Sequence, residues 1–162
     1  RWLERQLNDP FVAMAKQEGY RSRAVYKISG MDEKAKIFKA GQMVIDLGAA
    51  PGSWSQWVGK KFQGRSTIIA VDILPVAALP GVTFIQGDFT EDTIQDQIRA
   101  LLGDKKADVI MSDMAPPTTG HRPTDHLRII GLVEEAWYFA KSHLAHNGAF
   151  ICKVWQGGAE NT

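Results

Sequence analysis

The chain has 162 residues, 44% hydrophobic and 23% charged, which fits a single globular domain with a substantial core. Its apolar runs are too short to span a membrane, no signal peptide opens it, and a single cysteine excludes a disulfide framework, so we expect a cytoplasmic protein. The net charge of +1 conceals an asymmetry: residues 1–39 carry nine Lys and Arg against five Asp and Glu, and the remainder carries ten against thirteen. A basic segment of this kind either attracts phosphate groups or forms a solvated helical face, and charge alone leaves both open.

The predicted elements alternate between helices and strands. Asp9-Pro10 predicts the capped start of a short helix that Gly19 ends, and residues 23–38 have the spacing of a second helix. Apolar runs predict strands at 43–47, 66–71, 82–86, 107–111 and 149–154. Helices are expected at 53–62, at 90–102 and from Thr124 to about 145. Thr90 is the predicted cap of the second of these helices, and Asn147-Gly148 is the predicted stop of the third. This order predicts an α/β fold with a mostly parallel sheet and helices on both faces.

A turn of small residues follows the first strand. Val44 to Leu47 are mostly apolar, and Gly48-Ala49-Ala50-Pro51-Gly52 leads into the helix at Ser53. Small side chains allow a ligand to approach the backbone closely, and the helix start offers free N–H groups. The glycine spacing is not G-x-G-x-x-G, so a nucleoside cofactor without a pyrophosphate is favoured. The alternative is a tight turn with no ligand.

Acidic residues recur at the carboxyl ends of the predicted strands. Asp72, Asp88 and Asp113 each follow a strand, and the ends of parallel strands meet at one edge of a sheet. Any one of these residues can be a turn cap, but three beside a glycine turn predict a ligand site. We expect Asp72 at the ribose and Asp88 near the adenine amino group of the cofactor.

Lys153 lies within the apolar fifth strand, next to the expected position of Asp113. Burial of a lysine costs free energy unless it is paired, so a lysine beside an aspartate in a cleft is a candidate for proton transfer. A strand lysine that extends to solvent is the simpler alternative. The four histidines and Cys152 do not have the spacing of a metal site, and Gly-x-Ser-x-Gly is absent, so neither a zinc centre nor a hydrolase is indicated.

Four segments of the chain contain distinctive motifs: RSRAVYK at 21–27, DLGAAPGSWSQ at 46–56, SDMAP at 112–116 and KVWQG at 153–157. In their order and spacing, they resemble a known family, the FtsJ (RrmJ-type) ribosomal RNA 2′-O-methyltransferases. The resemblance covers nearly the whole chain. It implies a Rossmann-like fold that uses S-adenosylmethionine and acts on a ribose 2′-hydroxyl, in the bacterial branch on a uridine of large-subunit (23S) ribosomal RNA.

The resemblance also implies roles for individual residues. Lys27, Asp113 and Lys153 match three members of a Lys-Asp-Lys-Glu catalytic set, with Lys153 as the candidate base. Gly48, Gly52, Trp54, Asp72, Asp88 and Asp113 match the cofactor contacts. Arg21, Arg23 and Lys27 are expected to hold the RNA, and no metal is implied. Residues 1–39 would form a basic helical segment and residues 40–162 the cofactor-binding core of one domain, active as a monomer.

The fourth catalytic residue, a glutamate, is expected beyond Thr162, because Glu160 follows Lys153 too closely to take that role. The apolar fifth strand would also form an exposed edge if the chain ended there, so we expect further strand and helix beyond it.

Three alternative functions remain open from the sequence. The first is a 2′-O-methyltransferase of transfer RNA or an RNA cap, and the second is an RNA-binding module that retains the cofactor fold without turnover. The third is a nicotinamide dehydrogenase, which the missing G-x-G-x-x-G disfavours.

Overall fold

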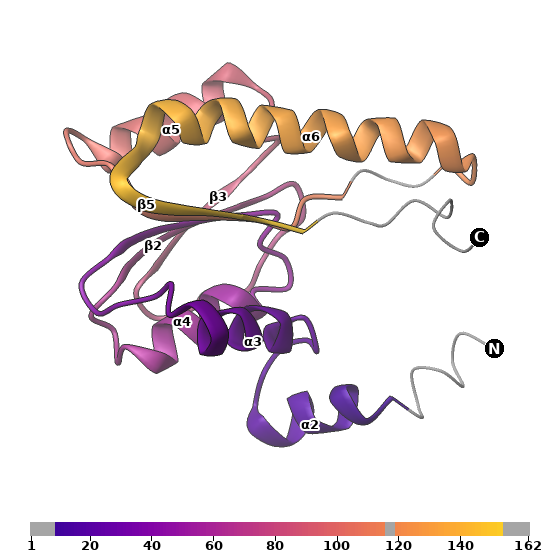
Figure 1. Cartoon of the computed structure of the whole chain (residues 1–162), viewed down its shortest axis with the longest axis vertical. Coiled ribbons are helices and arrows are strands. Elements are labelled where there is room, and N and C mark those ends of the chain that lie inside the picture. The colour runs from indigo at the N-terminus through magenta and orange to yellow at the C-terminus, as the bar shows by residue number, and fades with distance from the viewer. Residues whose placement is uncertain (1–8, 116–118, 154–162) are drawn as a thin grey trace.

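The computed structural model describes residues 9–115 and 119–153, which form a parallel sheet between two helical layers. The strands are β1 (Met43–Leu47), β2 (Thr67–Asp72), β3 (Val82–Gln86), β4 (Ala107–Ser112) and β5 (Leu144–Cys152), in the order β3-β2-β1-β4-β5. The helices are α2 (Pro10–Glu18), α3 (Val25–Ala35), α4 (Ser53–Lys61), α5 (Asp92–Leu102) and α6 (Arg122–His143). Figure 1 shows α5 and α6 over one face of the sheet and α3 and α4 over the other.

The first strand lies at the centre of the sheet because it is apolar on both faces. Val44, Ile45 and Leu47 are fully buried, and β1 pairs in parallel with both β2 and β4. The chain order reverses at β1, since β2 lies on one side of it and β4 on the other. In open parallel sheets, ligands bind at such a reversal, outside the carboxyl ends of the strands.

Each face of the sheet has its own core. On the α5 and α6 side, Ile94, Ile98 and Leu102 of α5 are buried, and their spacing of four residues places them on one face of the helix. On the other side, Ile28 of α3 and Val58 of α4 pack against the sheet. The predicted parallel α/β fold with helices on both faces is therefore confirmed.

Several predicted boundaries were wrong, including the start of the fifth strand, which lies at Leu144 and not at Ala149, and both ends of the second helix, which spans Val25–Ala35. Thr90 does not cap α5, whose N-cap is Glu91, because Asp88 accepts hydrogen bonds from both the backbone N–H and the hydroxyl of Thr90. The long helix α6 begins at Arg122 behind His121 rather than at Thr124. It ends at His143, before Asn147-Gly148, because the chain enters β5 at Leu144 and these two residues lie in an irregular stretch of that strand.

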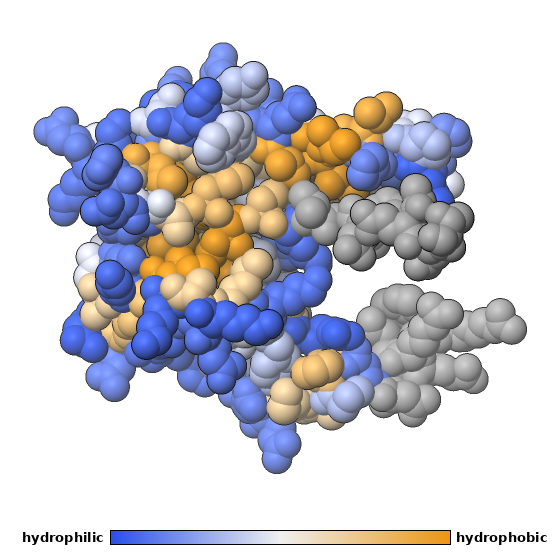
Figure 2. Space-filling view, viewed as in Figure 1, coloured by the Kyte–Doolittle hydropathy of each residue, from blue (hydrophilic) through white to orange (hydrophobic). Residues whose placement is uncertain are grey.

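Among the described residues, β5 is an edge strand that pairs only with β4. Figure 2 shows hydrophobic side chains over this edge, where Phe150 contacts Trp137 of α6 at a ring-centroid distance of 5.7 Å. The strand ends at Cys152, so Lys153 lies just beyond it and not within it as predicted. Val154, Glu160 and the expected elements beyond Thr162 lie outside the described residues. No helix in the described part of the chain is long and apolar enough to cross a membrane.

Candidate active site

A cavity of about 830 Å³ lies at the carboxyl ends of β1, β2, β3 and β4. Gly48, Asp72, Asp88 and Asp113 line it, so the structure brings together the predicted acidic residues and the first glycine of the turn. Gly48 has φ of +73°, and a Cβ there would lie 2.7 Å from the backbone of Asp113 and Met114. The small residue is therefore required where the turn after β1 meets the turn after β4.

Two of the three aspartates also hold the backbone around the cavity. Asp72 accepts hydrogen bonds from the N–H groups of Ala50 and Leu74, each at 2.8 Å, and so fixes the turns after β1 and β2. Asp88 accepts from the N–H and hydroxyl of Thr90 with one carboxylate oxygen. Their expected cofactor contacts stay predictions, and the structure adds a turn-capping role for each.

Asp46, which the sequence reasoning did not single out, belongs to β1 and has 1% of its surface exposed, and the charges of the cavity-lining Asp72 and Asp113 act on it. One carboxylate oxygen accepts a 2.7 Å hydrogen bond from the Ser55 hydroxyl, while the other is buried and has no hydrogen-bond partner among the described residues. Burial raises the pKa of Asp46 to about 7, and the negative charges of Asp113 and Asp72 contribute to this rise. Its position within an otherwise apolar strand was the signal for a special role.

Two predicted cofactor residues do not line the cavity. Trp54 is 5% exposed, belongs to the core on the α3 and α4 side, and donates its indole N–H to the carbonyl oxygen of Ala24 at 2.8 Å. Gly52 has φ of +108°, and a Cβ there would lie 2.9 Å from the Arg21 guanidinium. The structure thus gives Trp54 a role in packing α3 against α4, and it gives Gly52 a close contact with Arg21.

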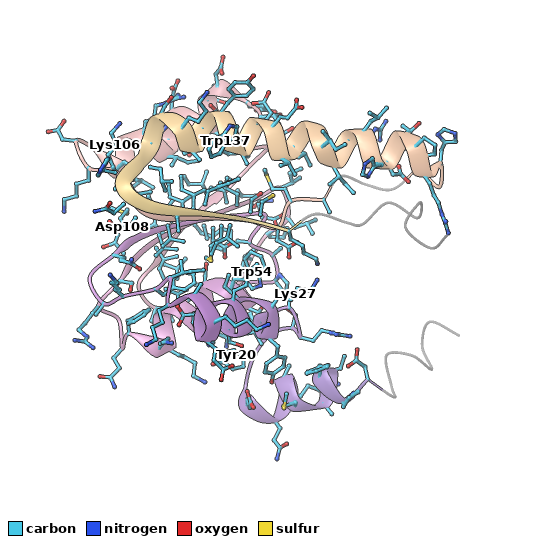
Figure 3. All side chains as sticks on the ribbon, in the orientation of Figure 1. Tyr20, Lys27, Trp54, Lys106, Asp108 and Trp137 are labelled. Carbon is cyan, nitrogen blue, oxygen red and sulfur yellow. The ribbon has the colours of Figure 1, made fainter. Side chains whose placement is uncertain are left out.

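The predicted neighbours Asp113 and Lys153 are brought together at the ends of β4 and β5. Lys153 Nζ lies 3.5 Å from Asp113 Oδ1, and the Lys153 N–H donates to the Ser112 carbonyl at 2.9 Å, which fixes the register of the two strands. Burial raises the pKa of the Asp113 carboxyl, and the positive charges of Lys153 and Lys27 oppose that rise. Lys27 extends from α3 toward the end of β5 (Figure 3). The three predicted catalytic residues therefore share one electrostatic environment.

A second hollow, of about 450 Å³, lies on the other side of this ion pair. Its lining consists of Phe11, Arg23, Ala24, Tyr26, Lys27 and Lys153. Asp113 lines the first cavity and Lys153 the second, so their ion pair lies between the two spaces. Two of the three residues predicted to hold RNA, Arg23 and Lys27, lie in this hollow.

Arg21, the third of them, lies elsewhere. Its guanidinium donates hydrogen bonds to the carbonyl oxygens of Pro51, Ala77 and Ala78, at 3.1, 2.8 and 3.2 Å. Its backbone N–H also donates to the Gln56 side chain at 3.0 Å. Arg21 thereby links the basic segment to both the glycine turn and the loop after β2. Its contact with RNA phosphate stays a prediction, and these bonds indicate a structural role instead.

Other cavity residues that sequence reasoning missed come from α6. Arg128, Gly131, Leu132 and Glu135 line the cavity, and their spacing of three, one and three residues places them on one face of that helix. This periodicity was visible in the sequence. Among residues 9–115 and 119–153, no group of three or more His, Cys, Asp or Glu side chains is arranged to hold a metal ion.

Comparison with known proteins identifies the family. The model of the FtsJ-like methyltransferases matches residues 20–162. The chain belongs to this family. It is 54% identical to the ribosomal RNA large subunit methyltransferase E of Rhodopseudomonas palustris strain HaA2, over 99% of this chain and 70% of the relative. The protein of the same name from Afipia carboxidovorans is 55% identical, over 99% of this chain and 72% of the relative.

Solved structures agree with this assignment. A ribosomal RNA methyltransferase from Plasmodium falciparum superimposes with a TM-score of 0.79 at 32% identity, over 88% of this chain and 82% of that one. A short-chain dehydrogenase family protein from Francisella tularensis, at a TM-score of 0.53 and 13% identity, over 70% of this chain and 51% of that one, shares the fold alone. The predicted family resemblance, Rossmann-like fold and S-adenosylmethionine-dependent methyltransferase activity are therefore confirmed.

Proposed function

We propose that this methyltransferase transfers a methyl group from S-adenosylmethionine to a ribose 2′-hydroxyl of large-subunit ribosomal RNA. The observation that carries the proposal is the Asp113–Lys153 ion pair between an acidic cavity and a cationic hollow. The cofactor would occupy the first space and the RNA the second. The relatives, which are named as ribosomal RNA large subunit methyltransferases, support this choice of RNA.

The acidic cavity has the chemistry of an S-adenosylmethionine site. Asp72, Asp88 and Asp113 line it, and the charges of Asp72 and Asp113 act on the buried Asp46. Burial is the main cause of the raised pKa values of Asp46 and Asp113, and repulsion from neighbouring carboxylates raises both further: Asp113 and Asp72 act on Asp46, and Asp72 acts on Asp113. A ligand with a positive ammonium and a positive sulfonium group would relieve this repulsion. Apolar walls such as Val71 and Leu132 suit an adenine ring.

When bound, S-adenosylmethionine supplies a methyl group already activated by the positive sulfur. The chain's own residues therefore mainly position the ribose hydroxyl and remove its proton. Lys153 in its neutral form would accept that proton at Nζ; the Asp113 carboxylate would hold the neutral amine as a hydrogen-bond acceptor and would form the ion pair once Lys153 is protonated. Lys27, on the hollow side, would bind the phosphate next to the reacting ribose.

The proposed function also includes the roles of two regions of the chain, the oligomeric state, the cellular compartment and the target nucleotide. We assign residues 1–39 to RNA binding and residues 40–162 to the cofactor core of one domain, acting as a monomer on the large ribosomal subunit in the cytoplasm. A uridine is the expected target. A transfer RNA, an RNA cap or a role without turnover would be distinguished by the acceptor that becomes methylated.

The test is methyl transfer from labelled S-adenosylmethionine to large ribosomal subunits, free large-subunit RNA and transfer RNA. The modified ribose is then located by its resistance to alkaline hydrolysis. We expect methylation of large-subunit RNA, abolished by Lys153→Ala while calorimetry shows nearly unchanged S-adenosylmethionine binding. Lys106→Ala is the matched control, because Lys106 precedes β4 at the opposite end of the sheet and donates to the Ser142 carbonyl. Near-normal turnover of Lys153→Ala would show that Lys153 is not the base.

A further inference from the structure

The hollow beside Lys153 has aromatic walls that the methyl-transfer step does not use. Phe11 of α2 and Tyr26 of α3 contact each other with ring centroids 5.7 Å apart and planes tilted by 44°. The Arg23 guanidinium lies 5.3 Å from the centre of the Phe11 ring. Arg23 also forms an ion pair with Asp9, the residue that caps α2, and Tyr26 donates its hydroxyl to Glu18 at 3.0 Å. These contacts hold both rings in place.

The two rings lie outside the hydrophobic core. In the described part of the chain, neither belongs to a core cluster, and Phe11 is 43% exposed. Ala15 is the one buried residue of α2, so this helix contributes little to folding through its apolar side chains. A large aromatic surface that remains exposed beside a functional cleft is available for a ligand.

The chemistry of the hollow fits an unstacked nucleobase. Aromatic faces stack on bases, and every base offers a face of this kind. Arg23, Lys27 and Lys153 line the same hollow and supply positive charge for the adjoining phosphates. Its volume of about 450 Å³ is larger than a single ring system needs, and the proposed function would place the reacting ribose at Lys153, on the wall of this hollow.

We propose that Phe11 and Tyr26 form a stacking platform for one nucleobase of the RNA, the base on the reacting ribose or its immediate neighbour. The proposal rests on the proposed function, because that function places the ribose at Lys153. The substrate is then a nucleotide taken out of its base stack, as in a loop or a locally opened helix, because a stacked base cannot reach the platform.

The first test uses a short single-stranded oligouridine with one central 2-aminopurine, whose fluorescence is quenched when the base stacks on an aromatic ring. We expect the wild-type protein to quench this probe. Phe11→Ala should reduce the quenching and weaken binding about fivefold or more, as expected for the loss of one base–aromatic stack. Phe11→Tyr should restore both, since it keeps the ring.

Tyr138→Ala is the matched control, because Tyr138 is 66% exposed on α6 with Lys141 above its ring, on the opposite face of the sheet. This variant should quench and bind like wild type. Equal quenching and affinity of Phe11→Ala and wild type would overturn the platform. Loss of binding by Tyr138→Ala to the same degree would also overturn it, because the effect would then be general.

A second readout separates this proposal from the proposed function. In methyl transfer to large-subunit RNA, Phe11→Ala should raise KM for the RNA about fivefold or more, with S-adenosylmethionine affinity unchanged. Quenching without methyl transfer by the wild-type protein would refute the function and support the platform. Methyl transfer with an unchanged KM in Phe11→Ala would refute the platform and leave the function supported.

Discussion

The contact between the turns after β1 and β4 can be tested with a single methyl group at Gly48. In Gly48→Ala, the added Cβ would lie 2.7 Å from backbone atoms of Asp113 and Met114. Gly41 provides a matched control, because it also has a positive φ, +83° against +73°, but a Cβ there would meet no atom of the described residues within 4 Å. Both substitutions therefore share the cost of a left-handed backbone, and only Gly48→Ala has the clash.

The magnitude follows from these contacts. A left-handed alanine costs about 1–2 kcal/mol in either variant. Carbon atoms in contact prefer roughly 3.5 Å or more, so relief of the clash requires a movement of about 0.8 Å. Such a shift would stretch the 2.9 Å hydrogen bond from the Asp113 N–H to the Leu47 carbonyl. Forcing extra atoms into a packed site costs about 1–3 kcal/mol, which is the expected excess of Gly48→Ala over Gly41→Ala.

Thermal unfolding and calorimetry measure the two consequences. Each kcal/mol of excess destabilisation should lower Tm by about 2–4 °C for a chain of this size. Because Gly48 and Asp113 line the cofactor cavity, Gly48→Ala should also weaken S-adenosylmethionine binding about tenfold or more, on the scale of about 1.4 kcal/mol per decade. Gly41→Ala should bind normally. Equal Tm and equal affinity of the two variants would refute the argument that this close approach shapes the site.

Three further substitutions test other features of the site. Arg21→Ala should weaken S-adenosylmethionine binding, because the Arg21 guanidinium holds the turn at Pro51 and the loop at residues 73–81. Arg23→Ala should weaken RNA binding alone, because Arg23 lines the second hollow. If calorimetry and RNA titration gave the reverse pattern, the assignment of Arg21 to the cofactor side and Arg23 to the RNA side would be wrong. Asp46 has a folded pKa of about 7, above its unfolded value, so the stability that its neutral form contributes is lost as pH rises. In urea unfolding, the free energy of unfolding of the wild type should therefore fall by roughly 3 kcal/mol relative to that of Asp46→Asn between about pH 4 and 7, and a difference that does not change with pH would contradict the raised pKa. Asp72→Ala should weaken cofactor binding by about 1–3 kcal/mol, since it removes the acceptor for two turn N–H groups, and unchanged affinity would exclude it from the site.

The cofactor side of the site could be predicted because it depends on local rules. Hydrophobic runs located the strands, and a parallel sheet brings the carboxyl ends of its strands to one edge, so Asp72, Asp88 and Asp113 had to lie near Gly48. The pairing of Asp113 with Lys153 followed from the same rule once β4 and β5 were neighbours. Helix starts were less predictable, because Thr90 and Thr124 have the residue type of a cap but are themselves bound by Asp88 and His121.

Sequence alone determined the fold class, the family and the acidic edge of the sheet, since these follow from periodicity and from motifs with fixed spacing. Tertiary structure decided which polar side chains are engaged in hydrogen bonds within the protein. The Trp54 indole donates to the Ala24 carbonyl, and the Arg21 guanidinium donates to three carbonyls of distant loops. Tertiary structure also created the hollow where Phe11, Tyr26 and Lys153 meet. Such contacts join residues that are far apart in the sequence. Their geometry depends on how α2 and α3 pack beside the sheet, and no local sequence pattern encodes that packing.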